Sequence, residues 1–152
     1  MIGVAGANQY AIGGQDAFVT QDTDLFLPSD PDNLERCWAA CGDTGLELWC
    51  GDEPLDRPRD RWLADRIVER GALTQARSDE LIVDLTLVMA GFTFEEAWAE
   101  RRVFTVEGAD LPVARLLHIV QSKHAAGRDK DRLFLATHRD ALEQLLRKRE
   151  PN

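Results

Sequence analysis

The fold is decided by two stretches, FVTQDTDLFL at residues 18–27 and LIVDLTLVM at residues 81–89. Alternate residues of a strand point to opposite faces, so the first stretch predicts a strand with Asp22 and Asp24 on one face. The second stretch is dense in leucine and β-branched residues, as is typical of a central strand. Asp84 lies inside it, where an ionised carboxylate costs free energy unless a cation or hydrogen-bond donors meet it.

Helical and strand-like segments make up the rest of the chain. Capping residues, prolines and glycines predict helices at 8–17, 31–41, 60–70, 93–101, 112–126 and 129–149, the last interrupted near 137 or 138. Further strands are predicted at 2–7 and 46–50, a loop at 51–59, and a hairpin at 102–111 that turns at Gly108-Ala109. Residues 73–80 are polar and give no clear signal. The pattern indicates one α+β domain over residues 1–152, without internal repeats or linkers.

Composition and charge exclude several classes of protein. The chain has 152 residues, of which 44% are hydrophobic and 30% charged, so neither a disordered nor a fibrous protein fits. Its net charge of −9 argues against a broad nucleic-acid surface, because neutralising many phosphates needs a face rich in lysine and arginine. A protein that binds one nucleotide through a cation remains compatible with this charge.

Cysteine content and hydropathy predict a cytoplasmic protein. Three cysteines cannot all pair within the chain, and the N-terminus lacks the basic region of a signal peptide. The longest apolar stretch, residues 81–92, is too short to span a bilayer and contains Asp84, so no membrane segment is expected. Cys37 and Cys41 lie one helical turn apart, and we interpret them as small buried residues rather than zinc ligands.

The three aspartates offer hard oxygen ligands of the kind that Mg²⁺ prefers. Two aspartates two residues apart project side by side, and a third on a neighbouring strand would complete a site. Two such ions can clamp the attacking and leaving oxygens of a phosphoryl displacement. The alternative for Asp22 and Asp24 is that both are solvated on an open edge strand, but solvation explains Asp84 poorly.

A basic segment follows near the C-terminus. Residues 121–139 contain five lysines and arginines and only two aspartates, against the acidic background of the chain. Lys123 and Arg128 flank Gly127 closely enough to reach one anionic ligand. The alternative is an ordinary solvated helix face, in which Lys130 and Asp131 pair with neighbouring side chains.

Together these segments resemble the nucleotidyltransferase-fold superfamily, in particular the small bacterial proteins akin to AbiEii toxins and minimal nucleotidyltransferases. The resemblance covers about residues 3–135 and is carried by VAGA at 4–7, TQDTDLF at 20–26, Asp84 in LIVDLTL, and KHAAGRDKD at 123–131. It implies a mixed sheet flanked by helices. It also implies Mg²⁺-dependent transfer of a nucleoside monophosphate from a nucleoside triphosphate to a hydroxyl acceptor.

The resemblance also implies roles for individual residues. Asp22, Asp24 and Asp84 would bind magnesium, two ions being expected, and Asp84 is also a candidate base for the acceptor hydroxyl. Lys123 would contact phosphates of the nucleotide, while Arg128 either assists it or pairs with an aspartate. Thr20 precedes the metal pair as it does in the family.

The phosphate-binding turn of the family has two candidates in this chain. We prefer Gly6-Ala7 over Gly13-Gly14, because the apolar strand that should precede the turn is predicted directly before it. Ala7 departs from the family pattern, which has glycine or serine at the second position.

Three functions follow as hypotheses. The first is the nucleotidyltransferase, alone or as one half of a toxin–antitoxin pair, whose acceptor is a small molecule, a protein hydroxyl or a tRNA end. The second is a catalytically weak or inactive protein of the same fold that serves as an antitoxin or interaction protein. The third is a nuclease, which the acidity of the chain disfavours. A homodimer and a cognate antitoxin are both open as partners.

Overall fold

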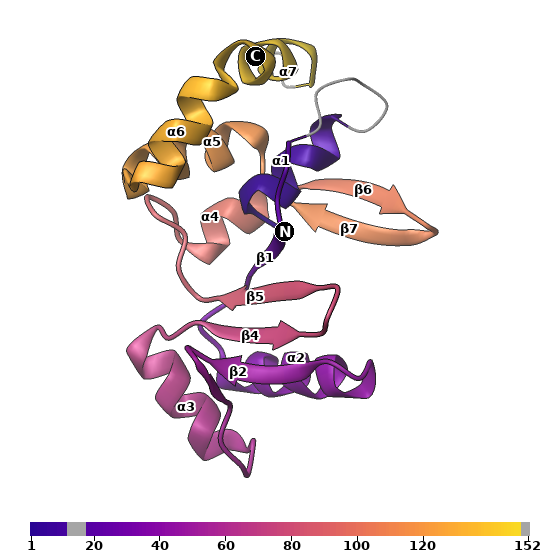
Figure 1. Ribbon diagram of the computed structural model, residues 1–152, viewed down its shortest axis with the longest axis vertical. Helices are drawn as coiled ribbons and strands as arrows, with labels where there is room; N and C mark the ends of the chain where they lie inside the picture. Colours follow the sequence, from indigo (N-terminus) through magenta and orange to yellow (C-terminus); the bar gives the residue numbers. More distant parts are fainter. Residues whose placement is uncertain (12–17, 150–152) are drawn as a thin grey trace. The chain divides into compact units, whose positions relative to one another are not determined.

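The computed structural model describes residues 1–11 and 18–149, and the chain divides into two compact units (Figure 1). The sheet unit is Gln21–Val88, and the helical unit consists of Met1–Thr20 and Met89–Asn152. Helices and a mixed sheet both occur, which confirms the α+β class. The expectation of one domain over the whole chain stays a prediction.

Five strands form the sheet of the sheet unit. Their spatial order is β1 (Asp22–Phe26), β5 (Ile82–Thr86), β4 (Thr74–Arg77), β2 (Glu47–Cys50) and β3 (Glu53–Pro54). β1 runs parallel to β5, whereas every other neighbouring pair is antiparallel. The sheet is therefore mixed, and Figure 1 shows β5, β4 and β2 side by side in it.

Two helices, α2 (Pro31–Asp43) and α3 (Arg61–Arg70), cover one face of this sheet. Their apolar side chains pack against the inward residues of the strands in a single buried cluster: Leu34, Trp38, Leu48, Leu55, Ala64, Ile67, Ala76, Val83, Leu85 and Leu87. Inward residues alternate with outward ones along β4 and β5, as the two-residue period of a strand requires. The opposite face of the sheet carries Gln75, Arg77 and Asp84 together with Trp49 and Ile82.

A hydrogen bond inside this core yields a stability prediction. Trp38 Nε1 donates to Thr74 Oγ1 at 3.1 Å, and both residues are almost fully buried. Replacing Thr74 by valine keeps the shape but leaves the indole N–H without an acceptor, so we expect a loss of about 1–3 kcal/mol in the free energy of unfolding. Urea denaturation measures the loss. The same change at exposed Thr137 is the control, expected to stay within about 0.5 kcal/mol; equal values for both variants would contradict the prediction.

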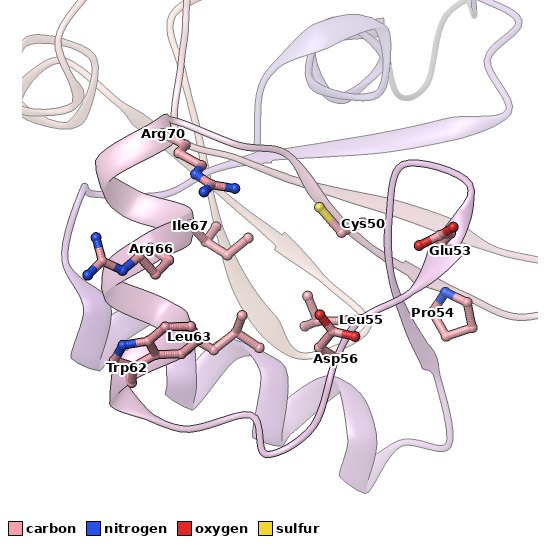
Figure 2. A pocket seen from close by; sticks show the side chains of 10 residues that line it. All are labelled: Cys50, Glu53, Pro54, Leu55, Asp56, Trp62, Leu63, Arg66, Ile67 and Arg70. Atoms are coloured by element: carbon pink, nitrogen blue, oxygen red, sulfur yellow. The ribbon is translucent and has the colours of Figure 1, made fainter.

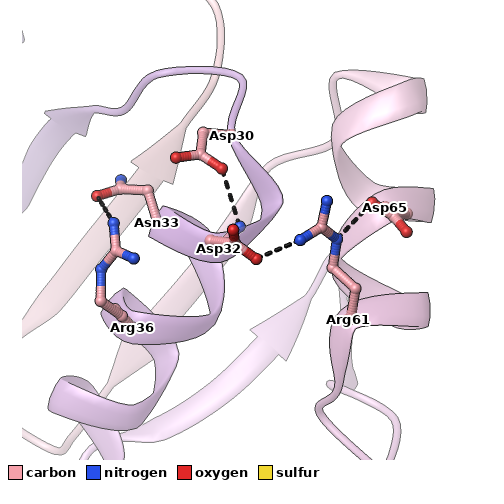
Figure 3. Close-up of polar contacts among 6 residues, drawn as sticks. All are labelled: Asp30, Asp32, Asn33, Arg36, Arg61 and Asp65. Carbon is pink, nitrogen blue, oxygen red and sulfur yellow. Dashed lines mark hydrogen bonds and ion pairs between the residues drawn. The ribbon is translucent and has the colours of Figure 1, made fainter.

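Polar contacts at the starts of α2 and α3 explain where these helices begin. The Asp30 side chain accepts a hydrogen bond from the Asp32 backbone N–H at 3.0 Å, and the Asp60 side chain accepts one from the Leu63 backbone N–H at 3.1 Å. Figure 3 shows Arg61 between Asp32 and Asp65, paired with both carboxylates. These ion pairs are exposed and contribute little to stability, so the apolar cluster accounts for most of the packing of the two helices.

The helical unit contains five helices and a hairpin among its described residues. Its elements are α1 (Gly3–Ala11), α4 (Phe94–Ala99), β6 (Arg102–Val106), β7 (Ala109–Val113), α5 (Leu116–Ala126), α6 (Asp129–Thr137) and α7 (Arg139–Arg149). The break between α6 and α7 at His138 confirms the interruption predicted near residues 137–138. Thr93 and Glu96 form a reciprocal capping box, which confirms the predicted start of α4.

The hairpin turns one residue earlier than predicted. Val106 pairs with Ala109, so the turn is Glu107-Gly108, and both residues have positive φ, 51° and 83°. Two central residues with positive φ match the right-handed twist of the flanking strands, which explains why glycine is needed at this place. The hairpin extends to Val113, and α5 consequently begins at Leu116 rather than at Pro112.

The strand predicted at residues 2–7 is wrong, because Gly3–Ala11 forms helix α1. Alanine is the best helix former, and α1 buries its alanines and Tyr10, whose hydroxyl donates to the Ala114 carbonyl at 2.9 Å. A Cβ placed on Gly6 would lie 3.1 Å from Ile119 of α5. Gly6 therefore allows close packing of α1 and α5, a cause that local periodicity does not reveal. Beyond Ala11, the rest of the helix predicted at 8–17 lies outside the described residues.

Three other predictions differ from the structure in the sheet unit. The strand predicted over Phe18–Leu27 is limited to Asp22–Phe26, and the loop predicted at 51–59 contains the short strand β3. The segment without a clear signal contains β4, which pairs with two neighbouring strands. Across residues 1–11 and 18–149, none of the helices combines the length and hydropathy that crossing a bilayer requires.

Candidate functional site

Asp22, Asp24 and Asp84 lie on one face of the sheet. The parallel register of β1 and β5 pairs Asp24 directly with Asp84, and Asp22 lies two residues before Asp24 on the same strand. In β5, Val83 and Leu85 are buried in the core, so Asp84 points to the other face, where it is half-buried. The structure thus brings the three predicted carboxylates to one surface of the sheet unit.

Asp24 and Asp84 are register partners on neighbouring strands, which lie about 4.8 Å apart in a sheet. The donor set fits Mg²⁺, which takes oxygen ligands and is usually held by one or two carboxylates completed by water and substrate phosphates. Within the part of the chain that the structure describes, no group of three or more His, Cys, Asp or Glu side chains is placed to hold a metal ion. The Mg²⁺ site predicted at Asp22, Asp24 and Asp84 therefore stays a prediction.

Gln75 and Arg77 on β4 extend this face and were not predicted as site residues. Gln75 Nε2 donates to Asp84 Oδ1 at 2.5 Å, and Arg77 Nε donates to Gln75 Oε1 at 3.0 Å. Both residues belong to the segment that gave no clear signal. The alternation of buried Thr74 and Ala76 with these two polar residues was the signal that could have revealed a strand.

Lys123 and Arg128 both pair with one buried carboxylate in the helical unit. Lys123 Nζ lies 3.0 Å from Asp131 Oδ1, and Arg128 Nε lies 2.6 Å from Asp131 Oδ2. Burial alone would raise the pKa of Asp131, which is 1% exposed, but the hydrogen bonds from Arg128 and Lys123 outweigh burial and hold the pKa below its usual value. Of the two arrangements left open for Arg128, the structure contains the pairing with an aspartate. A phosphate-binding role for either residue stays a prediction.

The predicted phosphate-binding turn at Gly6-Ala7 is absent, because both residues lie inside helix α1 and Ala7 is fully buried. The expectation of a strand followed by a tight turn, on which this choice depended, is therefore wrong. The alternative, Gly13-Gly14, lies outside the described residues. Thr20 is exposed and lies just before β1, two residues from Asp22.

The cysteines are free thiols, each partly buried. Burial raises the pKa of both Cys37 and Cys41, and the proximity of Cys41 raises the pKa of Cys37 further. These shifts favour neutral thiols, the form in which cysteine behaves as a small apolar residue.

A groove of about 530 Å³ lies between α3 and the β2–β3 side of the sheet unit (Figure 2). Arg66 and Arg70 line it on the helix, and Glu53 and Asp56 line it from the opposite side. Arg66 is also paired with Glu69 at 2.7 Å. None of the three aspartates of the sheet face lines this groove, so it is separate from the candidate site.

Comparison with known proteins adds no assignment to this geometry. No model of a protein family, no curated protein and no solved structure matches the chain.

Proposed function

We propose that this protein is a Mg²⁺-dependent nucleotidyltransferase that moves a nucleoside monophosphate from a nucleoside triphosphate to a hydroxyl acceptor. The observation that supports it is the parallel register of β1 and β5, which pairs Asp24 with Asp84 and keeps Asp22 on the same face. The proposal also rests on the resemblance of the sequence around these residues. The acceptor is a small molecule, a protein hydroxyl or a tRNA end.

The reaction balances as an in-line displacement. The acceptor oxygen forms a bond to the α-phosphorus, and the bond from the α-phosphorus to its bridging oxygen breaks as pyrophosphate leaves with the electron pair. Asp84, a metal ligand in this proposal, is also the candidate base for the hydroxyl proton, since its carboxylate accepts one hydrogen bond from the described residues, that from Gln75. Bound Mg²⁺ would supply neutralisation of the charge that develops in the reaction. Asp22, Asp24 and Asp84 would hold it, and the protein would contribute mainly positioning and electrostatics, on which phosphoryl transfer depends.

A second candidate is an inactive protein of this fold that acts as an interaction or antitoxin protein. Two observations favour it. Gly6 and Ala7 are used in helix packing, and Lys123 is bound to Asp131, so neither predicted phosphate contact is available in the expected form.

Labelled transfer separates the two candidates. The full chain is incubated with Mg²⁺ and each of the four α-³²P nucleoside triphosphates, alone and with a cell lysate. We expect label on one species, lost when EDTA replaces Mg²⁺. Calorimetric titration with Mg²⁺ and a triphosphate accompanies the assay. Absence of both label and binding heat would favour the interaction protein.

A further inference from the structure

We propose that Gln75 and Arg77 are positioning residues that hold the Asp84 carboxylate ready for a divalent cation. The inference rests on the proposed function and adds to it a supporting set of side chains on two neighbouring strands. Neither residue is assigned a role by the resemblance.

The hydrogen bonds determine which way the Gln75 amide points. A glutamine amide carries an acceptor oxygen and a donor nitrogen, whereas a guanidinium only donates and a carboxylate only accepts. Arg77 donates to Gln75 Oε1 through Nε at 3.0 Å and also through Nη2, so the amide nitrogen is directed to Asp84. Reversing the amide would place two donors against each other on one side and two acceptors on the other.

Arg77 is itself held from a third strand. Its Nη2 donates to the Gly51 carbonyl oxygen at 3.0 Å, and its guanidinium carbon lies 4.9 Å from the centre of the Trp49 ring. Gln75 is in register with Trp49 on one side and with Asp84 on the other. The contacts thus run across β2, β4 and β5 and end at the carboxylate.

The effect on Asp84 is to engage one oxygen and leave the other available. Oδ1 accepts from Gln75 at 2.5 Å, and Oδ2 accepts from no residue in the described part of the chain. A carboxylate held in this way loses less conformational freedom when it binds a cation. Residues that hydrogen-bond to metal ligands typically contribute about 10- to 100-fold to metal affinity or activity.

The test measures binding of Mn²⁺ alone to the full chain, by electron paramagnetic resonance, together with the thermal midpoint. In Gln75→Leu we expect the dissociation constant for Mn²⁺ to rise about 10-fold or more at an unchanged midpoint. Arg77→Leu frees the amide to rotate and should weaken binding by several-fold, whereas Arg77→Lys retains a donor and should restore most of the affinity. Gln144→Leu, at an exposed position of α7, is the matched control and should bind as the wild type does.

The outcomes separate this inference from the function on which it rests. If Gln75→Leu and both Arg77 variants bind Mn²⁺ as tightly as the wild type, the positioning role is overturned and the proposed function stays in place. A wild-type protein that neither binds Mn²⁺ nor transfers label would overturn both, and one that transfers label without binding Mn²⁺ would overturn the positioning role alone. A weakened affinity that simply follows a lower thermal midpoint would assign Gln75 a structural role and also overturn the inference.

Discussion

Replacing Asp24 by asparagine is expected to lower Mg²⁺-dependent transfer about a thousandfold while leaving the fold intact. Metal-assisted stabilisation of charge in the transition state is worth several kcal/mol, and each 1.4 kcal/mol or so corresponds to a factor of ten in rate. The asparagine side chain would offer only a neutral oxygen beside Asp84. Initial rates of labelled transfer at saturating triphosphate measure this loss.

The fold should stay intact in Asp24→Asn, because Asp24 lies outside the buried apolar cluster of the sheet unit, and circular dichroism checks this. Asp79→Asn is the matched control, an exposed aspartate in the turn between β4 and β5, and should keep wild-type activity. Transfer by Asp24→Asn within tenfold of the wild-type rate would rule out Asp24 as a ligand of the catalytic metal.

The second large effect concerns the buried ion pair of the helical unit. Lys123→Ala removes the better buried of the two cations on Asp131, with 13% of its side chain exposed against 61% for Arg128. Asp131, which is 1% exposed, is then left with Arg128 as the remaining one of these two cations. Breaking a buried pair by removing one partner costs about 3–5 kcal/mol, and the remaining arginine places the expected loss near the lower end, about 3 kcal/mol. Chemical denaturation at pH 7 measures it.

The control for this change is Lys130→Ala, an exposed lysine of α6 that should alter stability by less than about 0.5 kcal/mol. The pH dependence of stability in Lys123→Ala provides a second check. Because the pKa of Asp131 is lowered by folding, its contribution is fully present above the unfolded value of about 3.9 and is lost as the pH falls through the lower folded value. Lys123→Ala should therefore lose part of this acid dependence. A stability loss equal to that of Lys130→Ala would show that Asp131 does not need Lys123.

Local chemistry made much of the secondary structure predictable. The helices predicted to begin at residues 31, 60 and 93 begin at Pro31, Arg61 and Phe94, because Asp30, Asp60 and Thr93 cap them through contacts within a few residues. The strand period likewise placed Asp22 and Asp24 on one face without reference to any other part of the chain. Such features are set by backbone hydrogen bonds and side-chain direction, which depend on neighbours in sequence.

The sequence by itself determined that Asp22 and Asp24 share a face and that Asp84 lies in an apolar strand. Only the tertiary structure decided that Asp84 is the register partner of Asp24 and accepts a hydrogen bond from Gln75. Register, the helical state of Gly3–Ala11 and the pairing of Lys123 with Asp131 all depend on residues brought together across the chain. Their energies come from packing and ion pairing between distant segments, which the local period of a sequence does not contain.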